Sequence, residues 1–244
     1  MKGKYLLILL FSLISASGKC QYNDFGPGYQ LTLLGNPGLT GSEGVGSLRL
    51  SYLNFYPGNR FNIHSVNVSY DGYFPALHGG AGFYVSNDNL NGIINNLRGG
   101  FSYAYHFQAA RDLFISAGLS ASVCHRGYDF SGAILPDQID PMRGAVLPSG
   151  EILDLKGKSV LDLSTGFLFM SEHYFGGVAV NHLTEPDTDD SGYSESRINR
   201  RLLLHMAGDF DINADKTLKI RPLVKFELEK RYMSLGAGAV FESR

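Results

Sequence analysis

The feature that most constrains this sequence is a two-residue alternation that runs through three successive segments between Leu77 and Val123. In 77–86, 97–107 and 113–123, apolar residues share one face, and small or polar residues occupy the other. This period is typical of β-strands with two unlike faces. Each segment holds about ten residues, which exceeds most globular strands and matches a tilted strand that crosses a bilayer. The alternation therefore predicts a transmembrane β-barrel.

The same pattern recurs along the rest of the chain. It predicts seven further strands at 45–55, 61–70, 160–170, 174–183, 202–212, 218–228 and 231–241. Pro222 lies in the ninth strand, where it predicts an edge or a bulge because proline has no N–H for the ladder. The connections after strands two, four, six and eight are short, whereas those after strands three, five and seven are long and polar. This asymmetry is typical of outer-membrane barrels with short periplasmic turns.

The predicted fold class is therefore all-β, an antiparallel transmembrane β-barrel of outer-membrane type with about ten strands. An ordinary soluble β-domain is the alternative, and the strand length, the loop asymmetry and an export signal disfavour it. Ten is an even number that permits closure. However, the chain stops three residues after Phe241, so the sequence leaves closure open. An unpaired edge in lipid would need a partner strand.

The N-terminus predicts three regions. Residues 1–20 have the charged, apolar and small-residue parts of a secretory signal peptide. Cleavage before Gln21 is the first interpretation, and lipidation of Cys20, which Lys19 disfavours, is the second. Residues 21–44 contain Pro27, Pro37 and several glycines, which indicates a lead-in segment placed in the barrel lumen. Residues 45–244 form the predicted barrel domain.

Composition and motif spacing narrow the function classes. A net charge of −2 provides no basic field for nucleic acid. The seven histidines fall on separate predicted elements without metal-ligand spacing. Ser120 lies inside a strand and lacks the second glycine of a nucleophile elbow. We therefore expect no enzyme activity, no catalytic residue, no cofactor and no metal.

Several fragments occur in an order and spacing that is similar to the PorP/SprF family, outer-membrane proteins of the Bacteroidetes type IX secretion and gliding system. They are Asn36-Pro37-Gly38-Leu39-Thr40-Gly41, Ser69-Tyr70-Asp71-Gly72-Tyr73-Phe74, Tyr103-Ala104-Tyr105-His106, Leu135-Pro136-Asp137-Gln138-Ile139-Asp140 and Tyr174-Phe175-Gly176-Gly177-Val178-Ala179-Val180-Asn181-His182-Leu183. The resemblance spans most of the chain after the signal peptide. Family members continue past the point that matches Phe241 with further strands, so the resemblance also implies that this chain is short at its C-terminus.

The resemblance implies a non-enzymatic barrel in the cell outer membrane that helps export or anchor secreted surface proteins such as adhesins. Its expected partners are other type IX secretion components, those secreted proteins and outer-membrane lipid. A passive outer-membrane pore is the alternative function, and an outer-membrane enzyme comes third. The residues that match the family and are candidates for partner contact are Asn36, Pro37, Gly38, Thr40, Gly41, Asp137, Gln138 and Asp140.

Asp137, Gln138 and Asp140 lie in the long loop 127–155. This loop is longer than two strands need for a connection, and long loops on barrels commonly carry contacts. A partner-binding surface and a loop packed on itself are both open interpretations of these three residues.

Overall fold

The computed structural model describes residues 33–55, 57–58, 62–130, 134–140, 142–146, 148–150, 157–188, 197–213 and 217–243. The predicted signal peptide and residues 21–32 of the lead-in segment lie outside these ranges. The strands are β1 (Ser47–Phe55), β2 (Ile63–Phe74), β3 (Gly79–Leu90), β4 (Ile94–Ala110), β5 (Leu113–Tyr128), β6 (Ile139–Asp140), β7 (Gly144–Ala145), β8 (Lys158–Ser171), β9 (Tyr174–Asn181), β10 (Arg201–Gly208), β11 (Phe210–Asp211), β12 (Leu218–Glu229) and β13 (Tyr232–Ser243). Three short 3-10 helices are η1 (Pro37–Leu39), η2 (Pro75–Leu77) and η3 (Pro136–Gln138).

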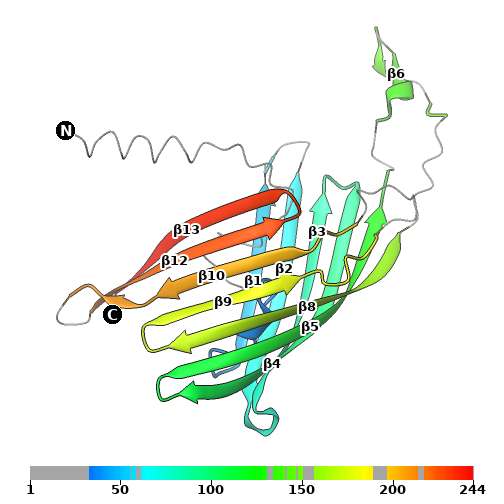
Figure 1. Cartoon of the computed structure of the whole chain (residues 1–244). Coiled ribbons are helices and arrows are strands. Elements are labelled where there is room, and N and C mark those ends of the chain that lie inside the picture. Colours follow the sequence, from blue (N-terminus) through cyan, green and yellow to red (C-terminus); the bar gives the residue numbers. More distant parts are fainter. Residues whose placement is uncertain are drawn as a thin grey trace, which may run out of the picture.

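The long strands form one antiparallel sheet in which each strand pairs with the next along the chain (Figure 1). Its order is β1-β2-β3-β4-β5-β8-β9-β10-β12-β13, with β11 continuing the line of β10 beside β12. Counting β10 and β11 as one strand, all ten predicted strands are present. The predicted all-β antiparallel fold class is therefore confirmed.

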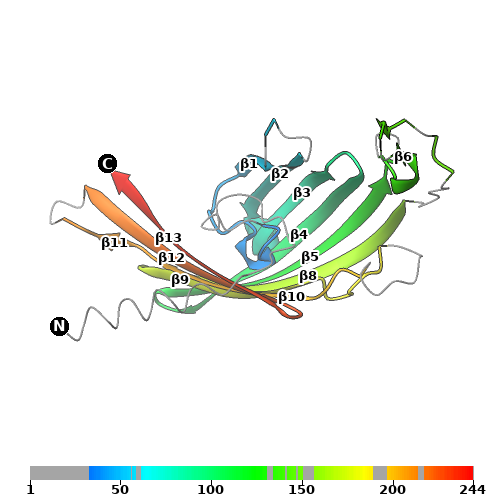
Figure 2. The same ribbon diagram turned by 90° about the horizontal axis from the view of Figure 1, so that it is seen from above.

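The sheet is strongly curved, and β1 and β13 form its two edges (Figure 2). Among the described residues, no ladder joins β1 to β13. The concave side of the sheet, here called the inner face, holds η1 (Figure 2).

The two faces of the sheet differ as the alternation predicts. Large apolar side chains are exposed on the outer face, such as Leu50, Phe101 and Leu119, whose exposed fractions are 73%, 75% and 64%. Small and polar side chains, such as Ser116 and Asp162, are buried on the opposite face. This is the reverse of a water-soluble sheet, and it is the distribution that hydrocarbon around the sheet requires.

One predicted loop is wrong. The connection after the third strand is not a long polar loop, because β3 and β4 continue as a ladder to the pair Leu90↔Ile94. Asn91, Gly92 and Ile93 then connect the two strands, with φ values of +58° at Asn91 and +73° at Gly92. Asparagine and glycine are the residues that adopt positive φ most readily. Backbone pairing continues through polar residues. The point where the apolar alternation stops therefore marks the edge of the apolar band on the sheet, and the strands themselves extend beyond it. The second strand likewise continues past Tyr70 to Phe74.

Pro222 interrupts the sheet locally and does not mark an edge. β12 pairs with β10 on one side and with β13 on the other. The ladder to the preceding strand stops at Ala207↔Leu223 and resumes at Phe210↔Ile220. The break that separates β10 from β11 therefore lies opposite Pro222, which has no N–H to donate there.

The long connection between β5 and β8 contains a small hairpin, β6–β7, which projects beyond the end of the main sheet (Figure 1). In the part of the chain that the structure describes, no helix has the length and apolar character needed to cross a membrane.

Candidate functional site: a strap seated on the inner face

Residues Asn36–Gly41, here called the strap, lie against the inner face of the sheet. The 3-10 helix η1 in the strap contacts β4, β5, β8 and β9. The side chains of Asn36 and Thr40 are both 0% exposed. Two buried polar side chains in one short segment must each find hydrogen-bond partners, because a buried polar group without a partner is costly.

Asn36 is the first anchor of the strap. Its Nδ2 donates to the carbonyl oxygen of Phe167 on β8 at 3.2 Å and lies 2.9 Å from Nε2 of His205 on β10. Its Oδ1 accepts from the backbone N–H of Gly38 at 2.8 Å, which caps η1. Because an amide nitrogen can only donate, Nε2 of His205 must accept, so this histidine is neutral with its hydrogen on Nδ1. One side chain thus joins the strap to two strands.

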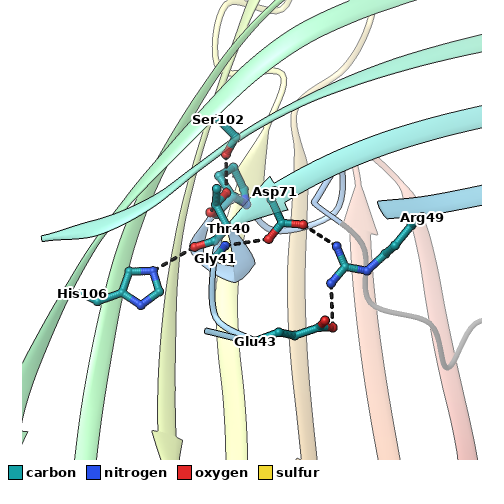
Figure 3. Close-up of polar contacts among 8 residues, drawn as sticks. Thr40, Gly41, Glu43, Arg49, Asp71, Ser102 and His106 are labelled. Carbon is teal, nitrogen blue, oxygen red and sulfur yellow. Dashed lines mark hydrogen bonds and ion pairs between the residues drawn. The ribbon is translucent and has the colours of Figure 1, made fainter. Parts of the chain in front are cut away.

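Thr40 is the second anchor (Figure 3). Its Oγ1 donates to the carbonyl oxygen of Pro37 at 2.7 Å and lies 2.6 Å from Oγ of Ser102 on β4. Its carbonyl oxygen accepts from Nε2 of His106 at 2.8 Å. One strand further along the sheet, Ser116 on β5 donates to the carbonyl oxygen of Gly38 at 2.7 Å. The sheet therefore bonds both the two anchor side chains and the backbone carbonyls of Gly38 and Thr40.

At the C-terminal end of the strap, Asp71, Arg49 and Glu43 form a chain of ion pairs (Figure 3). Oδ2 of Asp71 accepts from the backbone N–H of Gly41 at 2.6 Å, and Oδ1 accepts from Arg49 on β1. Arg49 also donates to Glu43 at 2.6 Å. Partial burial alone would raise the pKa of the Glu43 carboxyl, but the hydrogen bond and charge of Arg49 outweigh it and lower that pKa. Glu43 is therefore ionised at neutral pH.

Glycines of four strands make room for the strap. A Cβ atom would lie 2.1 Å from the carbonyl oxygen of Thr40 at Gly80, 2.3 Å from the carbonyl carbon of Pro37 at Gly118, 2.0 Å from Oδ1 of Asn36 at Gly166 and 2.7 Å from Nδ2 of Asn36 at Gly177. Real Cβ atoms do not approach other atoms so closely, so no other residue type fits while the strap is in place. We call the whole contact surface the seat. It comprises Asp71, Gly80, Ser102, His106, Ser116, Gly118, Phe167, Gly166, Gly177 and His205.

The five candidate residues of the lead-in segment lie together in the structure. Asn36, Pro37, Gly38, Thr40 and Gly41 are brought together in the strap. Gly80 and Gly177 each belong to a pair of adjacent glycines within a strand, Gly79-Gly80 and Gly176-Gly177, and both face the strap. For these two positions the reason for glycine is close approach of another backbone segment.

The second group of candidates lies elsewhere, in the projecting hairpin. Asp140 Oδ1 accepts from the backbone N–H groups of Met142 and Arg143, both at 2.8 Å. Asp137 accepts from Ser149 and from the backbone N–H of Gly150 at 2.7 Å. Gln138 Oε1 accepts from the backbone N–H of Leu135 at 2.8 Å. All three side chains thus bond to other groups of the same loop, and their role in partner contact stays a prediction. The exposed apolar side chains of this hairpin belong to other residues, Ile139, Met142 and Val146.

Sequence reasoning missed the residues that hold the strap. Asp71, Ser102, His106, Ser116 and His205 come from four strands, β2, β4, β5 and β10. Asp71 and His106 lie in fragments that resemble the family, but no local pattern marks any of the five as a partner of the strap. A usable signal was present, because Gly80, Gly118, Gly166 and Gly177 all fall on the polar face of their strands. Among the described residues, no three histidine, cysteine, aspartate or glutamate side chains are grouped to hold a metal ion.

A family model described as "Type IX secretion system membrane protein PorP/SprF" matches residues 14–243, which is nearly the whole chain. A search of curated proteins found no match.

Proposed function

The chain belongs to the PorP/SprF family of type IX secretion system membrane proteins, and from this premise we propose that it is a non-enzymatic component of the outer membrane that helps export or anchor secreted surface proteins. Its partners in this proposal are other components of the secretion system, exported surface proteins and outer-membrane lipid. The outer-membrane position is supported by the exposed apolar face of the ten-strand sheet.

The observation that carries the proposal is the occupied inner face. A passive pore needs a water-filled path along the inside of the sheet. Here the strap rests on the inner face of four neighbouring strands, with Asn36 and Thr40 fully buried. An inner face that is built to hold a peptide segment suits a protein that handles other polypeptides better than it suits an open channel.

The test of this proposal has two readouts. Deletion of the gene in the native cell, followed by surface labelling, is expected to reduce the amount of exported proteins at the cell surface. Reintroduction of the wild-type gene should restore them. Purified protein in a planar bilayer is expected to give little single-channel conductance. Normal surface export after deletion, together with steady conductance, would replace this proposal by the passive pore.

A further inference from the structure

We propose that the seat is a peptide-binding site, that the strap is its resident occupant, and that a segment of an exported protein displaces the strap and takes its place. This inference rests on the proposed function for the source of the peptide. The binding site itself is argued from the geometry of the strap and the seat.

The seat does not depend on the strap for its backbone structure. The ladders β4–β5, β5–β8 and β8–β9 run in continuous register past Ser102, Gly118, Gly166 and Gly177. The strap adds no strand to the main sheet. Its bonds to the sheet, through Asn36, Gly38, Thr40 and Gly41, are side-chain contacts that leave every ladder intact. Departure of the strap would therefore expose a groove in a sheet that remains paired.

The chemistry of the seat defines the peptide that it takes. Ser116 and His106 donate to backbone carbonyls two residues apart, which any peptide can offer. Selectivity comes from two positions, where His205 and Ser102 meet the side chains of Asn36 and Thr40. Glycines along the groove require the backbone itself to approach closely. The ligand class is thus a short turn of the pattern Asn-x-Gly-x-Thr with a compact backbone.

The segment that joins the strap to β1, residues 41–46, is suited to movement. Gly41 and Gly44 have φ values of +69° and +76°, which favour glycine and mark two points where the chain changes direction. Between Glu43 and Gly46 the chain is exposed. The exit contacts are an ion pair of half-exposed Glu43 with Arg49 and one bond to Asp71. Water can replace the ion pair at little cost, because exposed pairs contribute little to stability. The strap is therefore held by its buried bonds to the seat, and the exposed ion pair adds little to them.

A disulfide lock tests the exchange. Oγ1 of Thr40 and Oγ of Ser102 are 2.6 Å apart, so the double variant Thr40→Cys/Ser102→Cys places two thiols within reach of each other. Oxidation fixes the strap in the seat, and reduction leaves the strap without its Thr40 anchor. The probe is a fluorescent synthetic peptide of residues 33–44, added to the full-length variant purified in detergent. A peptide with alanine in place of Asn36 and Thr40 is the control.

The reduced double variant is expected to bind the probe at least about tenfold more tightly than the oxidised form, and the control peptide should bind neither form. Asn36→Ala, which releases the other anchor, should also bind the probe and serves if the double variant does not fold. Failure of the probe to bind either folded variant, or equal binding of the control peptide, would overturn the peptide site.

The same lock tests the exported partner in cells. The periplasm is oxidising, so the lock should close there without added oxidant. Surface labelling is expected to show reduced export in the double variant and recovery with a membrane-permeant reductant, while the same reductant leaves the export of the wild-type protein unchanged. Normal export by a fully oxidised lock would overturn exchange in trans. It would leave the proposed function standing, because that function is judged by deletion of the whole gene.

Discussion

Replacing Asn36 by Ala is the sharpest probe of the strap. The substitution removes two contacts with the sheet, to the carbonyl oxygen of Phe167 and to Nε2 of His205, and the cap on the N–H of Gly38. Each hydrogen bond contributes about 0.5–1.5 kcal/mol net, and a buried acceptor that loses its partner costs about 1–3 kcal/mol. We therefore expect the strap to be destabilised by about 2–4 kcal/mol relative to its seated state.

This loss is measurable as local opening by amide hydrogen exchange in detergent. The reporter is the N–H of Gly41, which is bonded to Asp71 and not to the substituted side chain. An opening free energy lower by about 2–4 kcal/mol should accelerate its exchange by roughly 30- to 1,000-fold. Amides within the β5–β8 ladder should keep their protection, because the register of that ladder does not involve the strap.

The matched control is Asn95→Ala, which truncates an exposed asparagine on β4. We expect its effect on the exchange of Gly41 to lie within about threefold of wild type, since exposed substitutions away from special contacts change stability little. If Asn36→Ala leaves the exchange of Gly41 as slow as this control does, Asn36 does not anchor the strap. A parallel loss of protection in the β5–β8 ladder would mean that the strap and the sheet unfold as one unit, contrary to the reasoning above.

Three further expectations follow from single contacts. Gly166→Ala places a methyl group 2.0 Å from Oδ1 of Asn36 and should accelerate the opening of the strap. Gly99→Ala is the control, because a Cβ atom there has no other atom within 4 Å, and it should leave strap opening unchanged. Hydrogen exchange measures both. The lowered pKa of Glu43 means that its ion pair with Arg49 stabilises the protein above the ordinary carboxyl pKa and is lost as pH falls through the lowered value. Glu43→Gln should therefore lower the free energy of unfolding by less than about 1 kcal/mol at neutral pH. It should also remove the part of the stability loss at acid pH that comes from this ion pair, and urea titration at several pH values measures both effects. Asp140→Ala removes the acceptor of two backbone N–H groups in the projecting hairpin and should speed tryptic cleavage there severalfold, with unchanged cleavage refuting a structural role.

The strands were predictable because the bilayer imposes a simple rule on them. Apolar residues must alternate with small or polar ones wherever one face meets lipid and the other does not. Most of the strands follow this rule, and segments such as Ile115–Val123 show it without interruption. Strand ends were less predictable, because β3 and β4 continue as a polar ladder where the apolar face has ended. Asn91-Gly92, a strong hairpin signal, was the available clue to their true ends.

The residues of the seat are scattered along the sequence, whereas those of the strap form one local pattern. Asn36-Pro37-Gly38 is a compact local pattern, so it is visible in the sequence. Its partners are Phe167 and His205, which are separated from Asn36 by 131 and 169 positions. No local pattern connects residues so far apart, and only the curvature of the sheet brings them to one surface. Local sequence also does not distinguish a partner-binding surface from a self-packed loop for the residues of the projecting loop.

The topology also fixes when the strap can reach its full set of contacts. The strap precedes β1 in the chain, but Asn36 needs His205, which lies on β10. The strands pair in chain order, so the complete seat exists only after β10 has joined β9. Glycine at Gly80, Gly118, Gly166 and Gly177 weakens the strands by roughly 0.5–1 kcal/mol each relative to alanine. The bonds of the buried anchors offset part of that cost only once the sheet has formed through β10. A seated strap therefore reports that this part of the sheet is complete, and an exported segment that replaces it would find its site only on an assembled protein.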